Sequence, residues 1–151
     1  MKERNIIYLL AILALFGLLL SGCNKDEDKE EPSSMTATID GNLFSATNFV
    51  FNIFSDTLTS VIGWANDEYL GFNLMNATTT GNYDVSITFP HTAQYSDDGQ
   101  SSFYLSRQGR VEVTENSTLR IKGTFEFLAV KSATQDTILV DNGQFDVSKN
   151  E

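Results

Sequence analysis

The residues of this chain that could act as nucleophiles, bases or metal ligands are few and scattered. His91 is the single histidine among 151 residues, and it follows Pro90 in a polar stretch. Nucleophilic catalysis of the triad type needs a base beside its nucleophile and a third group that orients the base. No such pattern surrounds His91, so we expect an exposed loop residue. One histidine and one cysteine are too few for the usual zinc sites, and we expect no metal, no cofactor and no enzymatic activity.

The acidic residues suggest two other kinds of chemistry. A glycosidase needs two carboxylates about 5–10 Å apart across a cleft, and the sequence alone does not pair any two. Glu126 and Asp146 fall on the polar faces of expected strands, where we interpret them as solvated. The stretch 97–99, Asp-Asp-Gly, could bind calcium, but it lacks the spacing of the EF-hand loop. We interpret it as an acidic turn.

Aromatic side chains could instead stack on sugars. Trp64 lies inside an apolar strand pattern, so we expect it in the core. Tyr95 differs because it lies in the longest polar stretch, PHTAQYSDDGQS, residues 90–101. Loops on a rigid β scaffold commonly carry recognition residues. Tyr95 is therefore our candidate ligand contact.

The single cysteine, Cys23, lies where an apolar run meets a charged one. Lys2 and Arg4 precede the run 6–20, which is fifteen residues long. A positive head followed by an apolar segment and small residues is typical of a secretory signal. The run is shorter than the ~20 residues that a membrane-spanning helix needs.

Residues 20–23, Leu-Ser-Gly-Cys, resemble the lipobox of bacterial lipoproteins. The resemblance implies cleavage before Cys23 and attachment of a diacylglycerol to its thiol. We therefore predict a lipoprotein signal peptide at 1–22 and lipidation of Cys23, which palmitate would label. The alternatives are an ordinary signal peptide and an uncleaved helix with an incidental cysteine.

Residues 23–34 are predicted to be the lipidated cysteine and an acidic flexible tether. Pro32 is the only apolar residue after the cysteine, so this stretch has little to bury. An acidic stretch behind a lipidated cysteine resembles the surface-export signal of lipoproteins from the Bacteroidetes. That resemblance implies an outer-membrane protein that faces the cell surface. A plain spacer and a periplasm-facing anchor are the alternatives.

Two short motifs resemble the acceptor that Bacteroidetes use for O-glycosylation of exported proteins. They are the Asp-Thr-aliphatic stretches at 56–58 and 136–138. Both fall in expected turns or at strand starts. Thr57 and Thr137 are therefore candidate O-glycosylation sites.

Residues 35–151 have the apolar spacing of a single all-β domain. Apolar residues recur at every second position, most clearly in 119–129 and 83–89, and helical spacing is not sustained. Turn residues separate these runs, and we expect strands to end in turns at Asp40-Gly41, Gln108-Gly109 and 141–143. Gly123 is expected to mark a bend or bulge. About nine or ten short strands predict an antiparallel β-sandwich or a flattened barrel.

Composition sets the broad class. The formal charge of -10 disfavours nucleic acid as a partner. Hydrophobic residues make up 41% of the chain, including eleven phenylalanines, which is enough for a core. With one cysteine the domain has no internal disulfide, so its core must stabilise it.

Four segments carry a resemblance to a known family. They are MTATIDG (35–41), GNYDV (81–85), IKGTFEF (121–127) and NGQFDV (142–147), in that order behind the lipobox. Together they look like a family of small lipoproteins from Bacteroidetes with a domain of unknown function. The resemblance covers residues 35–148 and implies an all-β, exported, lipid-anchored protein. It implies no activity and no site residues.

These observations favour a lipid-anchored cell-envelope protein that acts as a non-catalytic binding module. Its expected partners are the membrane, through the anchor, and a glycan, peptide or protein ligand. The alternative is a structural or accessory subunit of an outer-membrane complex, held by strand-edge pairing or an apolar patch. An acid-based glycan hydrolase is a third, weaker hypothesis.

Overall fold

The computed structural model describes residues 31–54, 57–99 and 102–149. The predicted signal peptide, Cys23 and most of the predicted tether lie outside these ranges. The described part contains ten strands, and none of its segments is a helix that could cross a membrane. The strands are β1 (Ser34–Ile39), β2 (Asn42–Ser45), β3 (Asn48–Phe54), β4 (Leu58–Ala65), β5 (Glu68–Met75), β6 (Gly81–Val85), β7 (Thr92–Ser96), β8 (Tyr104–Asn116), β9 (Arg120–Lys131) and β10 (Thr137–Ser148).

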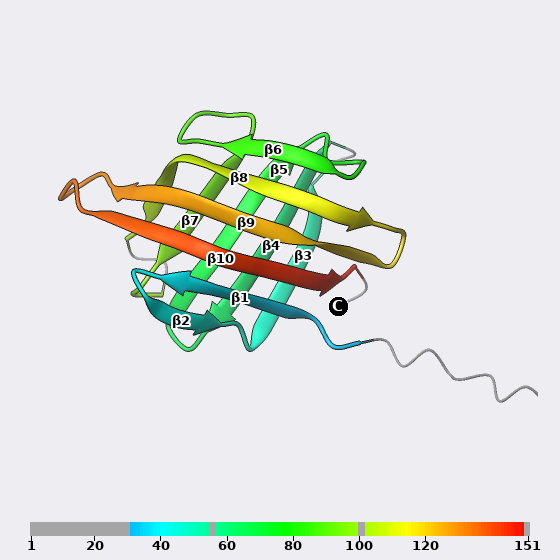
Figure 1. Ribbon diagram of the computed structural model, residues 1–151, viewed down its shortest axis with the longest axis horizontal. Helices are drawn as coiled ribbons and strands as arrows, with labels where there is room; N and C mark the ends of the chain where they lie inside the picture. Colours follow the sequence, from blue (N-terminus) through cyan, green and yellow to red (C-terminus); the bar gives the residue numbers. More distant parts are fainter. Residues whose placement is uncertain (1–30, 55–56, 100–101, 150–151) are drawn as a thin grey trace, which may run out of the picture. The chain divides into compact units, whose positions relative to one another are not determined.

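All ten strands belong to one antiparallel sheet that curls into two layers. The order is β2-β1-β10-β9-β8-β7-β5-β4-β3, and β6 also pairs with β8. In Figure 1 the long strands β8, β9 and β10 lie in front with β1, β2 and β6, and they cross over β7, β5, β4 and β3 behind. This half-barrel confirms the expected all-β class, a sandwich or flattened barrel.

Two chain segments carry the sheet from one layer to the other. The first half of β8 pairs with β7 and its second half pairs with β6. On the opposite side, β2 runs into β3, and the hydrogen bonds change partner at that corner. Ala46 N–H donates to Met35 O at 2.9 Å, and Thr47 N–H donates to Trp64 O at 2.7 Å. Gly63 leaves room for this corner, because a Cβ there would lie 2.8 Å from the Cβ of Ala46.

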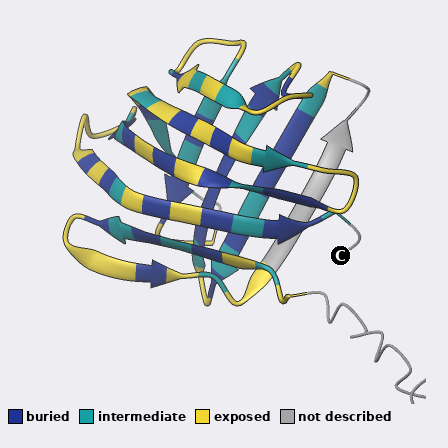
Figure 2. Ribbon diagram, turned by 45° about the vertical axis from the view of Figure 1, so that its right-hand side comes forward, coloured by how far each residue is buried: buried dark blue, intermediate teal, exposed yellow. Residues whose placement is uncertain are grey.

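The core fills the space between the layers. Phe72 of β5 lies 5.0 Å from the ring of Phe145 and 5.8 Å from the ring of Phe125, which come from β10 and β9. Figure 2 shows buried and exposed residues alternating along the front strands, as expected for strands with one wet face. The two layers are thus joined by phenylalanine rings.

Three glycines of the long strands each face a phenylalanine on the neighbouring strand. The register pairs Gly109 with Phe127, Gly123 with Phe145, and Gly143 with Phe125. A Cβ at Gly123 would lie 1.9 Å from Glu112 O and 2.7 Å from the Phe145 ring. Glycine kinks of this kind let a sheet bend. The rings of Phe145 and Phe125 pack against Gly123 and Gly143, and the Cβ of Phe127 packs against Gly109.

Several expected strand boundaries were wrong. Two of the expected turns are instead irregularities inside continuous strands, where the register shifts: Gln108-Gly109 in β8 and residues 141–143 in β10. Gly123, expected to mark a bend or bulge, lies opposite a register shift between Val113 and Glu115 of β8. The strands continue through these positions because the neighbouring strands pair on both sides of each irregularity, and Asn142 takes a left-handed φ of 50° at the one in β10.

The expected strand 83–89 ends early. β6 stops at Val85, and Ile87 and Phe89 are 51% and 72% exposed. The hydroxyl of Ser86 accepts a hydrogen bond from Thr88 N–H, which turns the chain away from the sheet.

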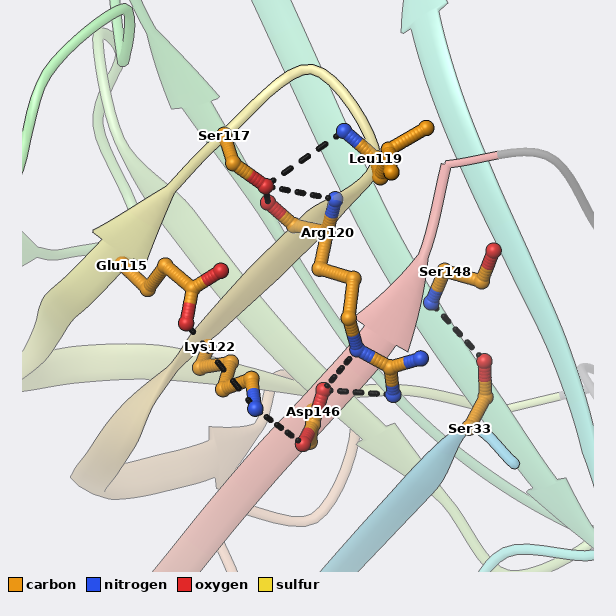
Figure 3. A network of polar contacts seen from close by, with 8 residues as sticks. All are labelled: Ser33, Glu115, Ser117, Leu119, Arg120, Lys122, Asp146 and Ser148. Atoms are coloured by element: carbon orange, nitrogen blue, oxygen red, sulfur yellow. Dashed lines mark hydrogen bonds and ion pairs between the residues drawn. The ribbon is translucent and has the colours of Figure 1, made fainter. Parts of the chain in front are cut away.

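Polar contacts join the start of β9 to the end of β10, and the end of β10 to the residue before β1 (Figure 3). The guanidinium of Arg120 contacts the carboxylate of Asp146 at 2.6 and 2.7 Å, and Lys122 reaches the same carboxylate at 3.0 Å. Ser148 N–H donates to the hydroxyl of Ser33, the residue before β1, at 2.9 Å. Asp146 is therefore an ion-pair partner rather than the solvated residue that its strand face suggested.

We expect Gly123→Ala to destabilise the fold by about 3 kcal/mol, because the added methyl overlaps backbone on one side and a ring on the other. Urea unfolding measures the change in the free energy of unfolding. Thr124→Ala, at the exposed next position of β9, is the control and should change stability by less than about 0.5 kcal/mol. Equal stability of the two variants would contradict the glycine–phenylalanine packing.

Candidate functional site

Tyr95, the candidate ligand contact, does not lie in a loop. It lies in β7, is only 6% exposed and belongs to the core cluster. The expectation of a long loop was wrong because Ala93 and Tyr95 alternate inward while β7 pairs with β5. That period of two within TAQYS was the available signal, and the surrounding polar residues masked it.

Tyr95 nevertheless lines a pocket of about 230 Å³ at the end of the curled sheet that carries the β1–β2 turn. We call it the mouth pocket. Its lining combines an apolar floor, two tyrosines and a rim that is polar except for one leucine: Ile39, Phe44 and Ile138; Tyr95 and Tyr104; and Asp40, Asn42, Leu43, Glu68 and Asp97. The ends of β-barrels are common places for small-ligand sites.

The tyrosine wall is built by strand register. Tyr95, Tyr104 and Lys131 are directly paired across β7, β8 and β9. The two tyrosine rings lie 6.0 Å apart, and the ammonium of Lys131 lies 5.0 Å from the centroid of the Tyr104 ring. Three adjacent strands therefore present two rings and a cation in one row.

The Tyr95 hydroxyl is fixed as a hydrogen-bond donor. It donates to the Glu68 carboxylate at 2.5 Å. Burial raises the pKa of Tyr95 well above its usual range, and the bond to Glu68 and the charges of Glu68 and Asp97 raise it further. Tyr95 is thus protonated at neutral pH and is unsuited to act as a base or a nucleophile.

The rim of the mouth pocket is held by the β1–β2 hairpin. Asp40 and Gly41 form its two-residue turn, both with positive φ (47° and 84°), as a type I′ turn requires. Asp40 also accepts a hydrogen bond from Leu139 N–H at 2.8 Å and donates its own N–H to Leu139 O at 3.0 Å. The expected Asp-Gly hairpin is confirmed, and its turn is bonded to β10.

Sequence reasoning missed Glu68 and Tyr104 as parts of this site. Glu68 is the first residue of β5, directly after the turn that consists of Asn66 and Asp67. Its side chain reaches the pocket because it shares a face with Leu70. The only sequence signal for Glu68 was its place two residues before Leu70, which puts a polar residue on the inward face at the start of the strand.

The other candidate residues lie apart from the mouth pocket. Thr57 is exposed in the turn before β4, and Thr137 is exposed at the start of β10, so their glycosylation remains a prediction. Trp64 is only partly buried and packs edge-on against Tyr69 at 5.6 Å. Asp98 accepts hydrogen bonds from Ser96 and from the Ser102 backbone, consistent with an acidic turn. No group of three or more metal-ligating side chains occurs within the described residues.

Two larger hollows lie side by side on the outer face of β8, β9 and β10. Their volumes are about 400 and 520 Å³, and both include Arg110 and Glu126. Most of the side chains around them are exposed, Glu126 among them, as its strand face predicted. They offer no buried polar group comparable to Tyr95, so the mouth pocket is the better candidate.

His91 is a half-buried structural residue rather than the exposed loop residue we expected. Its Nδ1 accepts a hydrogen bond from Met75 N–H at 3.1 Å, and its ring lies edge-on to Tyr83 at 5.3 Å. Burial lowers the pKa of His91, while the charge of Asp84 partly opposes this effect. The neutral ring thus ties the β6–β7 connection to the end of β5.

Comparison with protein families matches residues 31–147 to a family described as "Domain of unknown function (DUF6252)". The matched range covers all ten strands apart from the last residue of β10. Neither the curated proteins nor the solved structures contain a match to the chain.

We expect the stability of the fold to fall as pH drops below about 6.5, the ordinary pKa of histidine. The folded-state pKa of His91 is lowered, so the unfolded chain binds the proton first, and stability present above pH 6.5 is lost towards the lowered pKa. His91→Asn keeps an acceptor for Met75 N–H but does not titrate. Urea unfolding at several pH values should show this variant losing less stability than the wild type, by up to about 1 kcal/mol. Parallel pH profiles would contradict this role.

Proposed function

The chain belongs to this family of domains of unknown function, and from that premise we propose that it is a lipid-anchored cell-envelope protein whose curled sheet is a non-catalytic binding module. The lipobox-like Leu-Ser-Gly-Cys at 20–23 and the acidic stretch behind it support the anchor. The acidic stretch favours the outer membrane and the cell surface, as in the Bacteroidetes lipoproteins that it resembles. A periplasm-facing anchor is the alternative.

The observation that carries the binding function is the make-up of the mouth pocket. A protonated tyrosine and carboxylates lie over an apolar floor, at the end of the curled sheet. Small-ligand sites combine an apolar lining with a few fixed polar groups in this way. The volume of about 230 Å³ suits one sugar ring or one amino-acid side chain.

Non-catalytic binding is favoured over hydrolysis by the chemistry of the pocket. The hydroxyl of Tyr95 donates its hydrogen bond to Glu68. The single histidine, His91, lies outside the pocket and bonds to the end of β5. A hydrolase would need a general acid and a nucleophile or base facing one another. The three carboxylates that line the pocket are each engaged within the protein, Glu68 by the Tyr95 hydroxyl, Asp97 by the Lys131 ammonium and Asp40 by Leu139 N–H. The groups of the mouth pocket are better suited to hold a ligand.

The alternative function, an accessory subunit of an outer-membrane complex, is favoured by one feature. β3 ends the strand order and pairs with β4 over seven residues, and no described strand pairs with its other edge. An open strand edge can accept a strand from a partner. A fixed partner that co-purifies in stoichiometric amounts would favour this alternative.

We expect Cys23→Ser to abolish the incorporation of labelled palmitate in the native host and to release the protein from the membrane fraction. Asn24→Ser, which keeps the thiol, is the control and should be labelled normally. Protease treatment of intact cells should digest residues 35–151 if the domain faces outward, with lysed cells showing that the fold is cleavable. An unlabelled wild-type protein would refute the anchor.

We expect small ligands to perturb the tyrosine side chains of the mouth pocket. The chain has five tyrosines, so ¹³C-labelled tyrosine gives a simple NMR spectrum in which Tyr95 and Tyr104 are assigned by substitution. A panel of neutral and charged monosaccharides and blocked amino acids should shift these two resonances. Tyr95→Phe, which removes the hydroxyl that holds the Glu68 carboxylate in place, should weaken binding about fivefold, the worth of one hydrogen bond. Tyr83→Phe, whose hydroxyl bonds to Thr79 O outside the pocket, should not. An unmoved spectrum across the panel would refute the binding function.

A further inference from the structure

The mouth pocket already has one cation of the protein beside it. The ammonium of Lys131 lies 5.0 Å from the centroid of the Tyr104 ring and 3.7 Å from a carboxylate oxygen of Asp97. Both partners line the pocket, and the Lys131 side chain is 20% exposed. An aromatic face next to a carboxylate favours a positively charged group through both its ring and its charge. The position of Lys131 therefore indicates that this end of the pocket favours an ammonium group.

The charge of the pocket is not balanced by that one lysine. Three carboxylates belong to the lining, from Asp40, Glu68 and Asp97, and no lysine, arginine or histidine is among the described residues that line it. With Lys131 counted at its edge, the site carries three negative charges against one positive charge. A concave site lined by one sign of charge raises the local concentration of ligands of the opposite sign.

The remaining surfaces of the pocket limit the rest of the ligand. The floor of Ile39, Phe44 and Ile138 is apolar, so it can cover a short carbon body but offers no side-chain hydrogen bond. The carboxylate of Glu68 retains acceptor capacity beside the bond that it receives from Tyr95. A cationic head near the rim and a small body over the floor would use both surfaces.

We propose that the mouth pocket binds small ligands that carry a protonated amine, with the ammonium held by the pocket carboxylates and the tyrosine wall. This inference rests on the proposed binding function and names the class of ligand. Two sources share this chemistry, an amino sugar and a basic amino-acid side chain. The two share the ammonium group and differ in the carbon skeleton that carries it.

The test uses matched probes that differ in one charge. Glucosamine is compared with N-acetylglucosamine, and Nα-acetyl-lysinamide is compared with its Nε-acetylated form, at a pH at which the free amines are protonated. Each is titrated into the full-length protein in detergent micelles while the tyrosine NMR spectrum is recorded. We expect the charged member of at least one pair to bind at least about fivefold more tightly than its neutral partner. The pair that responds identifies the source.

Substitutions then test which residues of the protein interact with the charged group of the probe. Asp97→Asn should weaken binding of the charged probe about threefold or more, and Lys131→Gln should strengthen it because the ring and carboxylate lose their internal cation. Glu126→Gln, which removes a carboxylate from the outer face of β9, is the control and should leave the affinity unchanged. The tyrosine spectrum without probe shows whether each variant is folded.

The possible outcomes distinguish failure of the amine preference from failure of the proposed binding function. Equal binding of charged and neutral partners would overturn the preference for a protonated amine and leave the binding function standing. An unchanged affinity in Asp97→Asn, with Glu126→Gln also unchanged, would overturn the assignment of the charged group to this pocket. An unmoved tyrosine spectrum with every probe of the wider panel would overturn both.

Discussion

The curl of the sheet depends on the packing of phenylalanine rings against glycines of the neighbouring strands. β8, β9 and β10 are each at least twelve residues long and bend over β4 and β5. Side chains at Gly109, Gly123 and Gly143 would collide with backbone or with the paired ring. Because the glycines remove that obstacle, the rings can turn inward and meet Phe72 of the opposite layer. Without the bend the phenylalanine rings of the two layers would not meet.

The two ends of the curled sheet serve different purposes. At one end, Arg120 and Asp146 join β9 to β10, and Ser33 and Ser148 hold the entry of β1. At the other end the strands present tyrosines, carboxylates and the β1–β2 turn. The same long strands thus carry a structural polar network at one terminus and a candidate binding site at the other.

The sequence predicted the class of the fold better than the details of its site. Period-two spacing and the Asp40-Gly41 turn are local signals, so the all-β architecture and that hairpin were predictable. Gln108-Gly109 looked like a break because turn residues are read locally, whereas pairing with β9 keeps the chain extended there. The contact of Glu68 with Tyr95 joins residues that are 27 positions apart and depends on the pairing of β5 with β7. No spacing along the chain encodes that contact.

The position of β1 has a mechanical consequence. β1 pairs with β2 on one side and with β10 on the other, and the chain enters it at Ser33, at the end opposite the β1–β2 turn. A pull between the proposed anchor and a ligand bound in the mouth pocket would therefore act along the strand. Such a pull loads the interstrand hydrogen bonds together, in shear, rather than opening them one after another as when an edge strand is peeled. A domain loaded in this direction resists extension more strongly than one whose edge strand is peeled away.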